Sequence, residues 1–219
     1  MRLPRLYALR FNPVEQERRQ RVWRVLCRSF FQRYIEPGDT VLDIGAGYCE
    51  FINQIDCGRR IALDPSADVR RYAGPGVEVV QGVCTSLDAL ADATVDVVFA
   101  SNVFEHLPSK QHLLQALTEA RRVLRPGGRL LILQPNIRYA GGKYWDYFDH
   151  HLPLTHLSLV EGLRLAGFEP ERVIPRFLPY TVKDVRVKIR PRLVHAYLRL
   201  PLLWPVVGRQ MFVAARKSG

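Results

Sequence analysis

A short run of glycine and aspartate residues marks the part of this 219-residue sequence best suited to bind a ligand. An apolar stretch ends in Asp43-Ile-Gly45-Ala-Gly47, and the next apolar stretch ends in Asp64. Glycines at such a turn let the backbone approach a bound molecule closely. An acid after the second strand is placed to accept both hydroxyls of a ribose, whereas Asp43 suits a cationic ligand that carries an ammonium or sulfonium group.

A dinucleotide site is the competing interpretation of these glycines. The Gly-x-Gly-x-x-Gly pattern has its third glycine three residues after the second, where this sequence has Glu50. A carboxylate also fits poorly beside a pyrophosphate. The residues therefore favour the cationic ligand.

Histidines and acids gather at two later positions, Glu105-His106 and the aromatic segment Tyr144-Trp-Asp-Tyr-Phe-Asp-His-His151. Histidine is the side chain that exchanges protons most readily near neutral pH, so His150 and His151 are predicted as general bases. Asp146 or Asp149 is the expected orienting partner.

Alternating apolar strands and amphipathic helices must position these groups. Strands that read as nearly continuous Val, Ile and Leu runs indicate a parallel sheet with helices on both faces. The expected strands are 40–44, 60–64, 77–80, 95–100, 129–133, 173–178 and 210–215, and the expected helices are 13–34, a stretch from about Glu50, 110–124 and 158–166.

The order and spacing of five motifs resemble the class I S-adenosylmethionine-dependent methyltransferases from about residue 38 to 216. The motifs are Val41-Leu-Asp-Ile-Gly-Ala-Gly47, Ala62-Leu-Asp64, Val95-Asp-Val-Val-Phe-Ala-Ser-Asn-Val-Phe-Glu-His-Leu107, Arg122-Val-Leu-Arg-Pro-Gly-Gly-Arg-Leu-Leu-Ile132 and Leu165-Ala-Gly-Phe168. The resemblance implies an α/β Rossmann-like fold. Its seven-stranded, mostly parallel sheet would have the order 3-2-1-4-5-7-6, with the last strand antiparallel.

The resemblance also implies S-adenosyl-L-methionine as cofactor. Asp43, Gly45 and Gly47 would line its methionine portion and Asp64 would hold the ribose. Cys84 and Thr85, after the third strand, would contact the adenine, and Ser101, after the fourth, would be a further cofactor contact. Two residues depart from the family pattern: Cys49 replaces the third glycine, and Val83 replaces the acid that often follows the third strand.

Glu105-His106 invites comparison with a metal site. Some related O-methyltransferases and RNA 2′-O-methyltransferases bind a divalent metal through Glu-x-x-Glu-His and a distant histidine. The first of those glutamates is Asn102 here. We therefore expect no metal, with Glu105 and His106 shaping the pocket through local hydrogen bonds.

The net charge of +11 is divided unevenly along the chain. Residues 1–36, expected to form an N-terminal amphipathic helical segment, carry +6, and residues 172–219 carry +10. The methyltransferase domain is expected over 37–219, with a basic, apolar insertion at 179–209 that flanks the mouth of the site. Such a rim favours an anionic acceptor.

These features predict a methyltransferase that acts on a small molecule or glycan, including one linked to a lipid phosphate. The alternatives are an RNA methyltransferase, which the Arg-rich ends favour, and a non-catalytic binding protein on the same fold. No DNA substrate is expected, because Ser101-Asn-Val-Phe104 lacks the prolines of the amino-methylating DNA enzymes. Four cysteines without close pairing and an N-terminus unlike a signal peptide predict a cytoplasmic protein, with peripheral contact at the inner membrane surface as a further expectation.

Overall fold

A seven-stranded sheet forms the centre of the computed structural model, which describes residues 13–180 and 191–218, with side chains described from residue 16. The strand order is β3-β2-β1-β4-β5-β7-β6, as the sequence predicts. Only the pairings of β7 with β5 and β6 are antiparallel among the described strands. The strands are β1 (Thr40–Ile44), β2 (Arg59–Asp64), β3 (Val77–Gln81), β4 (Val95–Ser101), β5 (Leu124–Pro135), β6 (Phe168–Ile174) and β7 (Gln210–Lys217).

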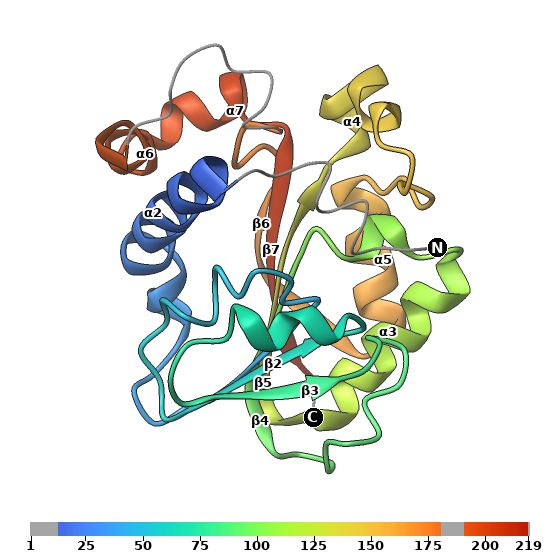
Figure 1. Ribbon diagram of the computed structural model, residues 1–219. Helices are drawn as coiled ribbons and strands as arrows, with labels where there is room; N and C mark the ends of the chain where they lie inside the picture. The colour runs from blue at the N-terminus through green and yellow to red at the C-terminus, as the bar shows by residue number, and fades with distance from the viewer. Residues whose placement is uncertain (1–12, 181–190, 219) are drawn as a thin grey trace.

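Helices cover both faces of this sheet (Figure 1). Helices α3 (Lys110–Val123) and α5 (His156–Leu165) pack on one face, where Leu117 and Leu163 are fully buried. On the other face lie α2 (Pro13–Ser29), the 3-10 turn η1 (Phe31–Tyr34) and α6 (Pro191–Leu198). The parallel strands therefore have two buried faces, which explains their continuous apolar runs.

The short elements lie near the carboxyl ends of the parallel strands. They include η3 (Phe104–His106) after β4, α4 (Ile137–Ala140) and η4 (Gly141–Asp146) after β5, and η5 (Pro201–Leu203) and α7 (Trp204–Val207) before β7. In Figure 1 the α4 region and the α6–α7 region stand at the top, on opposite sides of the sheet. A further 3-10 turn, η2 (Ala67–Arg71), follows β2.

The helix expected from about Glu50 is wrong, because residues 47–54 form consecutive turns. Cys49 takes a left-handed backbone with φ of 54°, which interrupts a helical hydrogen-bond ladder at its first turn. The Asn53 side chain then bonds outward, donating to the Tyr72 carbonyl and accepting from Gly74 N–H at 2.8 Å each. These contacts tie the turns to the residues that follow η2.

The expected sixth strand, 173–178, is also placed too late, since β6 ends at Ile174. Its earlier residues alternate, with Phe168 buried and Glu169 and Glu171 exposed, as on an edge strand. Pro175 follows the strand and cannot donate a backbone hydrogen bond. The apolar residues after it fold over the carboxyl edge instead of extending the strand.

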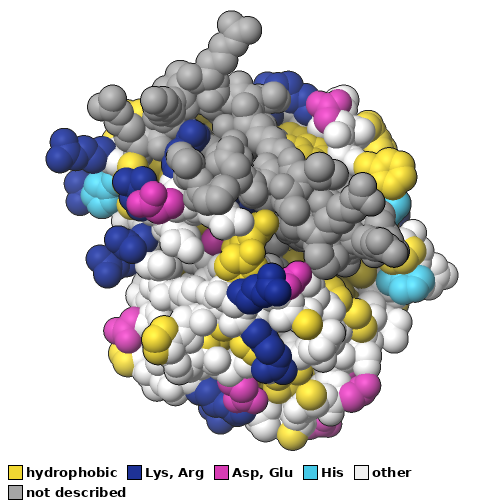
Figure 2. Space-filling view, viewed as in Figure 1, with side chains coloured by type: hydrophobic (Ala, Val, Ile, Leu, Met, Phe, Trp, Pro, Cys, Tyr) yellow, Lys and Arg dark blue, Asp and Glu magenta, His cyan; other side chains and the backbone are white. Residues whose placement is uncertain are grey.

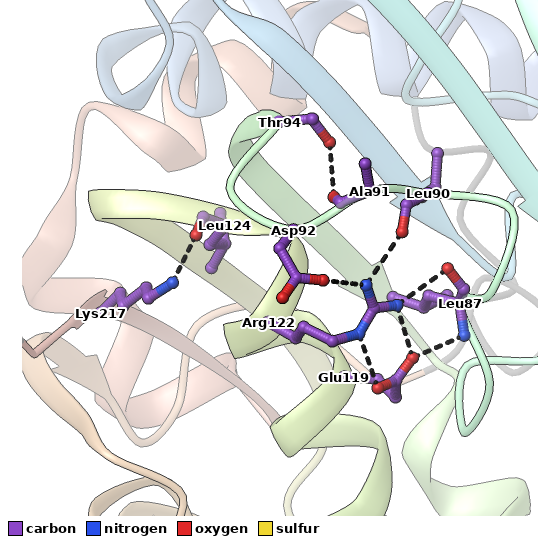
Figure 3. Close-up of polar contacts among 9 residues, drawn as sticks. All are labelled: Leu87, Leu90, Ala91, Asp92, Thr94, Glu119, Arg122, Leu124 and Lys217. Carbon is purple, nitrogen blue, oxygen red and sulfur yellow. Dashed lines mark hydrogen bonds and ion pairs between the residues drawn. The ribbon is translucent and has the colours of Figure 1, made fainter.

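The loop between β3 and β4 is fastened to α3 by the Arg122 guanidinium (Figure 3). This group donates to the carbonyls of Leu87 and Leu90, at 3.0 and 2.9 Å, and forms ion pairs with Asp92 and Glu119. Glu119 also accepts from the Leu87 N–H at 2.8 Å, and the hydrogen bonds from Arg122 lower the pKa of Glu119. A loop that carries two predicted adenine contacts is thereby held in one conformation.

Candidate functional site

The glycine turn after β1 requires its glycines for both space and backbone conformation. Gly45 has φ of +69°, and a Cβ placed on it would lie 2.6 Å from a methyl carbon of Val103. Gly47 has φ of +50°. Both backbone angles disfavour residues with a side chain, so the turn exposes main chain rather than side chains to whatever binds above it.

Asp64, at the end of β2, closes this turn. Its carboxylate accepts from Gly47 N–H at 2.9 Å and from Ser66 N–H at 2.8 Å. Burial raises the pKa of Asp64, while these two hydrogen bonds lower it. The predicted ribose acid and the predicted glycine turn therefore form one connected unit.

Asp43 lies beneath the turn and is 3% exposed. Its pKa is raised well above the usual value, first by burial and then by the negative charge of Asp64. Within residues 16–180 and 191–218 no lysine, arginine or histidine forms an ion pair with either aspartate. Two adjacent buried carboxylates are costly unless a cation or several hydroxyl donors reach them.

The fit to S-adenosylmethionine follows from these observations. This cofactor carries an ammonium and a sulfonium, whose positive charge Asp43 would balance, and two ribose hydroxyls, from which Asp64 would accept hydrogen bonds. The glycine turn leaves its backbone accessible, as Gly45 and Gly47 require. The chain's own residues therefore suit this cofactor in both charge and shape.

The predicted adenine contacts lie on the loop after β3. Cys84 is buried and its pKa is raised to about 11, so it remains a neutral thiol. Thr85 is half-buried beside it, whereas Val83 is 46% exposed. Ser101 is half-buried at the end of β4 and accepts a hydrogen bond from the Asn102 amide at 3.0 Å. Four neighbouring strands, β1 to β4, thus bring the cofactor candidates to one edge.

The sequence identifies Glu50 only as a mismatch with a dinucleotide pattern and does not predict its contact with α2. Its carboxylate is buried and accepts two hydrogen bonds from Arg19 of α2, at 2.6 and 2.7 Å. Paired geometry of this kind is among the stronger polar contacts in proteins. The N-terminal helix is thereby tied to the residues that follow the glycine turn, a link that no local sequence pattern reveals.

A second group of polar side chains follows β4, and Val103 connects it to the glycine turn. Glu105, His106 and His150 bring three potential ligand or proton-accepting atoms within 4.8 Å of one another. The rings of His106 and His150 meet edge to face, with centroids 5.2 Å apart. The predicted general base from the aromatic segment therefore joins the Glu-His pair from β4.

His106 is held in a defined orientation. Its Nδ1 lies 2.9 Å from the carbonyl oxygen of Asp149 and 3.4 Å from a carboxylate oxygen of the same residue. Because a carbonyl only accepts, Nδ1 donates this hydrogen bond, and in the neutral imidazole Nε2 then holds the lone pair. The His106 side chain is 27% exposed, so it is the member of the group that an incoming molecule can reach.

Glu105 lies behind the histidines and is 2% exposed. Burial raises the pKa of its carboxyl to about 7, and the charge of His106 opposes that rise. Its Oε2 has no hydrogen-bond partner among the described residues. A buried carboxyl in this state is poised between its charged and neutral forms near neutral pH.

Tyrosines surround His150. Its Nδ1 lies 3.0 Å from the Tyr144 carbonyl and 3.3 Å from the Tyr180 hydroxyl, and its ring stacks on Tyr147 at 4.8 Å. Burial raises the pKa values of Tyr144 and Tyr180, so both hydroxyls stay protonated. The aromatic segment therefore forms one wall of the second group.

Two predicted members lie outside this group. The His151 side chain is exposed, and only its main-chain N–H reaches the group, donating to the Glu105 carbonyl at 2.8 Å. Asp146 is exposed as well. Of the two predicted orienting acids, Asp149 is the one that contacts a histidine.

One carboxylate and two imidazoles are also a donor set for a divalent cation. The first glutamate of the related metal pattern is replaced by Asn102, whose side chain is exposed and bonds to Ser101. The expectation of no metal remains a prediction.

Comparison with known proteins matches residues 42–132 to the methyltransferase domain family model. A probable S-adenosylmethionine-dependent methyltransferase of Mycolicibacterium smegmatis is 38% identical over 149 residues, covering 64% of this chain and 56% of that protein. The human probable tRNA methyltransferase 9B is 30% identical over 112 residues, covering 48% of this chain and 23% of that protein. The chain spans between about a third and just over half of the length of the first curated relatives it matches.

The fold is shared with a methyltransferase of Archaeoglobus fulgidus described as SAM dependent. The two superpose with a TM-score of 0.67 at 19% identity, over 90% of this chain and 94% of that one. The strand order, the glycine turn with its two acids and the family model all indicate a methyltransferase that uses S-adenosylmethionine. Residues 42–132 match a methyltransferase domain, and the sheet around them has the fold of the class I S-adenosylmethionine-dependent methyltransferases.

Proposed function

We propose that this protein transfers a methyl group from S-adenosylmethionine to a hydroxyl oxygen of a small-molecule or glycan acceptor. The observation that carries the proposal is the orientation of His106, whose protonated Nδ1 points to the Asp149 carbonyl. The Nε2 lone pair is then available to a hydroxyl group. A nitrogen or carbon acceptor would have less need of such a base.

The bound cofactor supplies a methyl group on a sulfonium, which leaves as a neutral thioether when the acceptor oxygen forms the new C–O bond. His106 takes the hydroxyl proton onto Nε2, and Asp149 holds the imidazolium that results. Glu105, within the same 4.8 Å group, stabilises that positive charge when ionised. Positioning of the acceptor by the surrounding residues would supply much of the remaining rate.

Features around the site support the acceptor class. Trp145 and Phe148 are exposed on the aromatic segment, where sugar rings or other flat groups could stack. Arg192, Arg199 and Arg209 are exposed on the segment that precedes β7. Guanidinium groups bind phosphate or carboxylate well, so an anionic acceptor, including one linked to a lipid phosphate, fits this rim.

The test is transfer of tritiated methyl from S-adenosylmethionine into fractionated cell extract, separated into lipid, glycan, RNA and small molecules. We expect label in the glycan, lipid or small-molecule fractions and none with Asp43→Ala, because loss of the acidic floor weakens cofactor binding. Calorimetry gives cofactor affinity independently. No cofactor binding, or Asp43→Ala equal to the parent protein, contradicts the proposal; cofactor binding without transfer to any fraction supports the non-catalytic alternative.

RNA is the second candidate acceptor. The exposed arginines Arg21, Arg24 and Arg28 on α2 favour it, and a relative named as a tRNA methyltransferase shares 30% identity over 112 residues. This function predicts label in the RNA fraction and RNA binding that weakens steeply as salt rises. RNA binding that does not change with salt, together with no label in the RNA fraction, would exclude this function.

A further inference from the structure

The segment before β7 exposes a group of apolar side chains that the catalytic proposal does not use. Leu202 is 90% exposed and Val206 is 71% exposed, far more than apolar side chains of a packed core. Their neighbours are also exposed. We call this group the 193–207 surface, and its members are Leu193, Leu200, Leu202, Leu203, Val206 and Val207.

The underside of the same segment is firmly packed. Val194, Leu198 and Trp204 are buried, and the Trp204 ring meets Phe30 and Phe177 edge to face. The indole N–H of Trp204 donates to the Tyr197 carbonyl at 2.9 Å. Exposure of the other apolar residues is therefore a property of a folded segment with one buried and one outward side.

Backbone contacts fix the segment from its other end. The Arg176 guanidinium donates to the carbonyls of Val206 and Gly208, at 2.6 and 2.9 Å. Gly208 packs so closely that a Cβ on it would lie 2.5 Å from the Arg176 backbone. Ser29 of α2 lies 3.1 Å from His195, which joins the two helices.

The charged residues described on this segment are all basic. Residues 172–180 and 191–218 contain no Asp or Glu, and Arg192, Arg199 and Arg209 are all exposed. Arg28, next to the Ser29–His195 contact, adds a fourth exposed guanidinium. None of these four lies within 4 Å of a carboxylate among the described side chains. Figure 2 shows dark-blue side chains gathered at the upper left, where α2 and α6 lie.

We propose that the 193–207 surface docks on a membrane that contains anionic phospholipids. Exposed Leu and Val side chains beside unpaired arginines are the combination that binds at a lipid interface, where the apolar groups enter the acyl boundary and the cations meet phosphate. In the described residues no helix could cross a bilayer, so the contact is with one leaflet. A protein groove would complement the leucines but gives no reason for the surrounding positive charge.

Docking on this side would place the site mouth against the membrane. The segment connects β6 to β7 at the carboxyl edge, and the Arg209 carbonyl accepts from Asn136 N–H at the end of β5. The exposed Trp145 and Phe148 follow the same strand. If the proposed methyl transfer also holds, an acceptor anchored in lipid would reach the site without leaving the membrane.

The experiment is co-sedimentation of the full chain with vesicles of phosphatidylcholine, with and without phosphatidylglycerol. We expect binding to the mixed vesicles that falls on the order of tenfold in Leu202→Ser/Val206→Ser and several-fold in Arg199→Gln/Arg209→Gln. The matched controls are Leu157→Ser/Leu165→Ser on α5, which are 58% and 76% exposed, and Arg70→Gln on η2. All of the substituted residues are exposed, and circular dichroism checks that each variant is folded.

Failure of the parent protein to sediment with either vesicle overturns the proposal, as does equal loss in the α5 control. Light scattering that shows a dimer lost in Leu202→Ser/Val206→Ser, without vesicle binding, would assign the surface to self-association and also overturn it. The measurement needs neither cofactor nor turnover. Its failure is therefore distinguishable from failure of the proposed methyl transfer.

Discussion

At the scale of residues, Glu105 and His106 have different parts in the proposed proton transfer. The imidazole is partly exposed and oriented by Asp149, whereas the carboxyl is buried with its pKa raised to about 7. Proton uptake by such a group belongs to the coupled cluster rather than to one side chain. Two substitutions separate the roles.

Replacement of Glu105 by Gln removes the buried charge with little change in volume. We expect kcat of the parent protein to rise with pH through about 7, where Glu105 ionises, and to level off above it. Glu105→Gln should lower kcat roughly a hundredfold and abolish that rise. A pH–rate profile with saturating cofactor measures both effects, and an unchanged profile in the variant contradicts the assignment.

The stability of Glu105→Gln provides the control. In the folded protein this carboxyl keeps its proton up to about pH 7, whereas its ordinary pKa is 4.5. The native state therefore binds more protons than the unfolded chain between these values, and its stability falls as pH rises through that window. Chemical denaturation of the variant at pH 8 should give a free energy of unfolding no lower than that of the parent.

A rate dependent on added Mn²⁺ or Zn²⁺ and lost on chelation would assign the cluster to a metal instead.

His106→Gln tests the proton acceptor against its exposed neighbour. We expect kcat to fall between about a hundredfold and ten-thousandfold in His106→Gln, since Nε2 no longer accepts a proton. His151→Gln is the matched control, because that side chain is exposed and only its main-chain N–H contacts the group. Initial rates at fixed cofactor concentration suffice. Equal losses in the two variants would show that histidine content, rather than this geometry, matters.

At the scale of elements, loops attached to the sheet decide whether the cofactor residues meet. The loop after β3 buries Leu87 and Leu90 in the core, and Arg122 adds polar contacts that attach it to α3 (Figure 3). Lys217 similarly donates to the Leu124 carbonyl at 2.6 Å, joining the end of β7 to the start of β5. Single side chains therefore set the position of whole segments.

Arg122→Met keeps the aliphatic stem and removes the guanidinium. We expect the free energy of unfolding to fall by about 1–3 kcal/mol, because two carbonyls and two carboxylates lose their donor. Affinity for S-adenosylhomocysteine should fall as well, since the loop carries Cys84 and Thr85. Denaturant titration and calorimetry measure the two effects. Arg164→Met, which loses only an exposed ion pair with Glu169 at 3.7 Å, should change neither.

The sequence predicts the sheet well because apolar runs and glycine turns are local signals. The order of the seven strands is confirmed, although the sixth lies earlier than predicted, and the motif positions of Asp43, Gly45 and Asp64 fall at one edge. The turns at 47–54 were predicted as a helix because apolar spacing does not reveal the left-handed backbone of Cys49. The Arg19–Glu50 and His106–Asp149 contacts join residues 31 and 43 positions apart, and single-sequence periodicity carries no information about such pairs.

At the scale of the whole molecule, acidic and basic side chains gather in different places, although the net charge is +11. The floor of the candidate cofactor site is acidic, and the segment before β7 is basic. Asp43 and Asp64 lie buried below the glycine turn, while Arg192 and Arg199 are exposed on α6 and just after it. The two ligands of the proposed reaction thus meet opposite charges. Separate substitutions should affect them separately.

Arg192→Gln/Arg199→Gln should raise the KM for an anionic acceptor several-fold, since two guanidinium groups near its approach are lost. The Kd of S-adenosylhomocysteine should remain unchanged, because the cofactor residues lie on other elements. Steady-state kinetics and calorimetry provide the comparison. Equal weakening of acceptor and cofactor would show that the segment supports the fold rather than the acceptor.

The reversed direction of β7 has a practical consequence. This strand starts beside the site and ends at the opposite edge, where Ser218 N–H donates to the Gly167 carbonyl (Figure 1). An affinity tag joined after residue 218 would therefore attach the protein to a sensor chip by the edge of the sheet opposite the candidate site. Cofactor, acceptor and vesicles could then be flowed over an unobstructed upper surface, with every immobilised molecule presenting the same side.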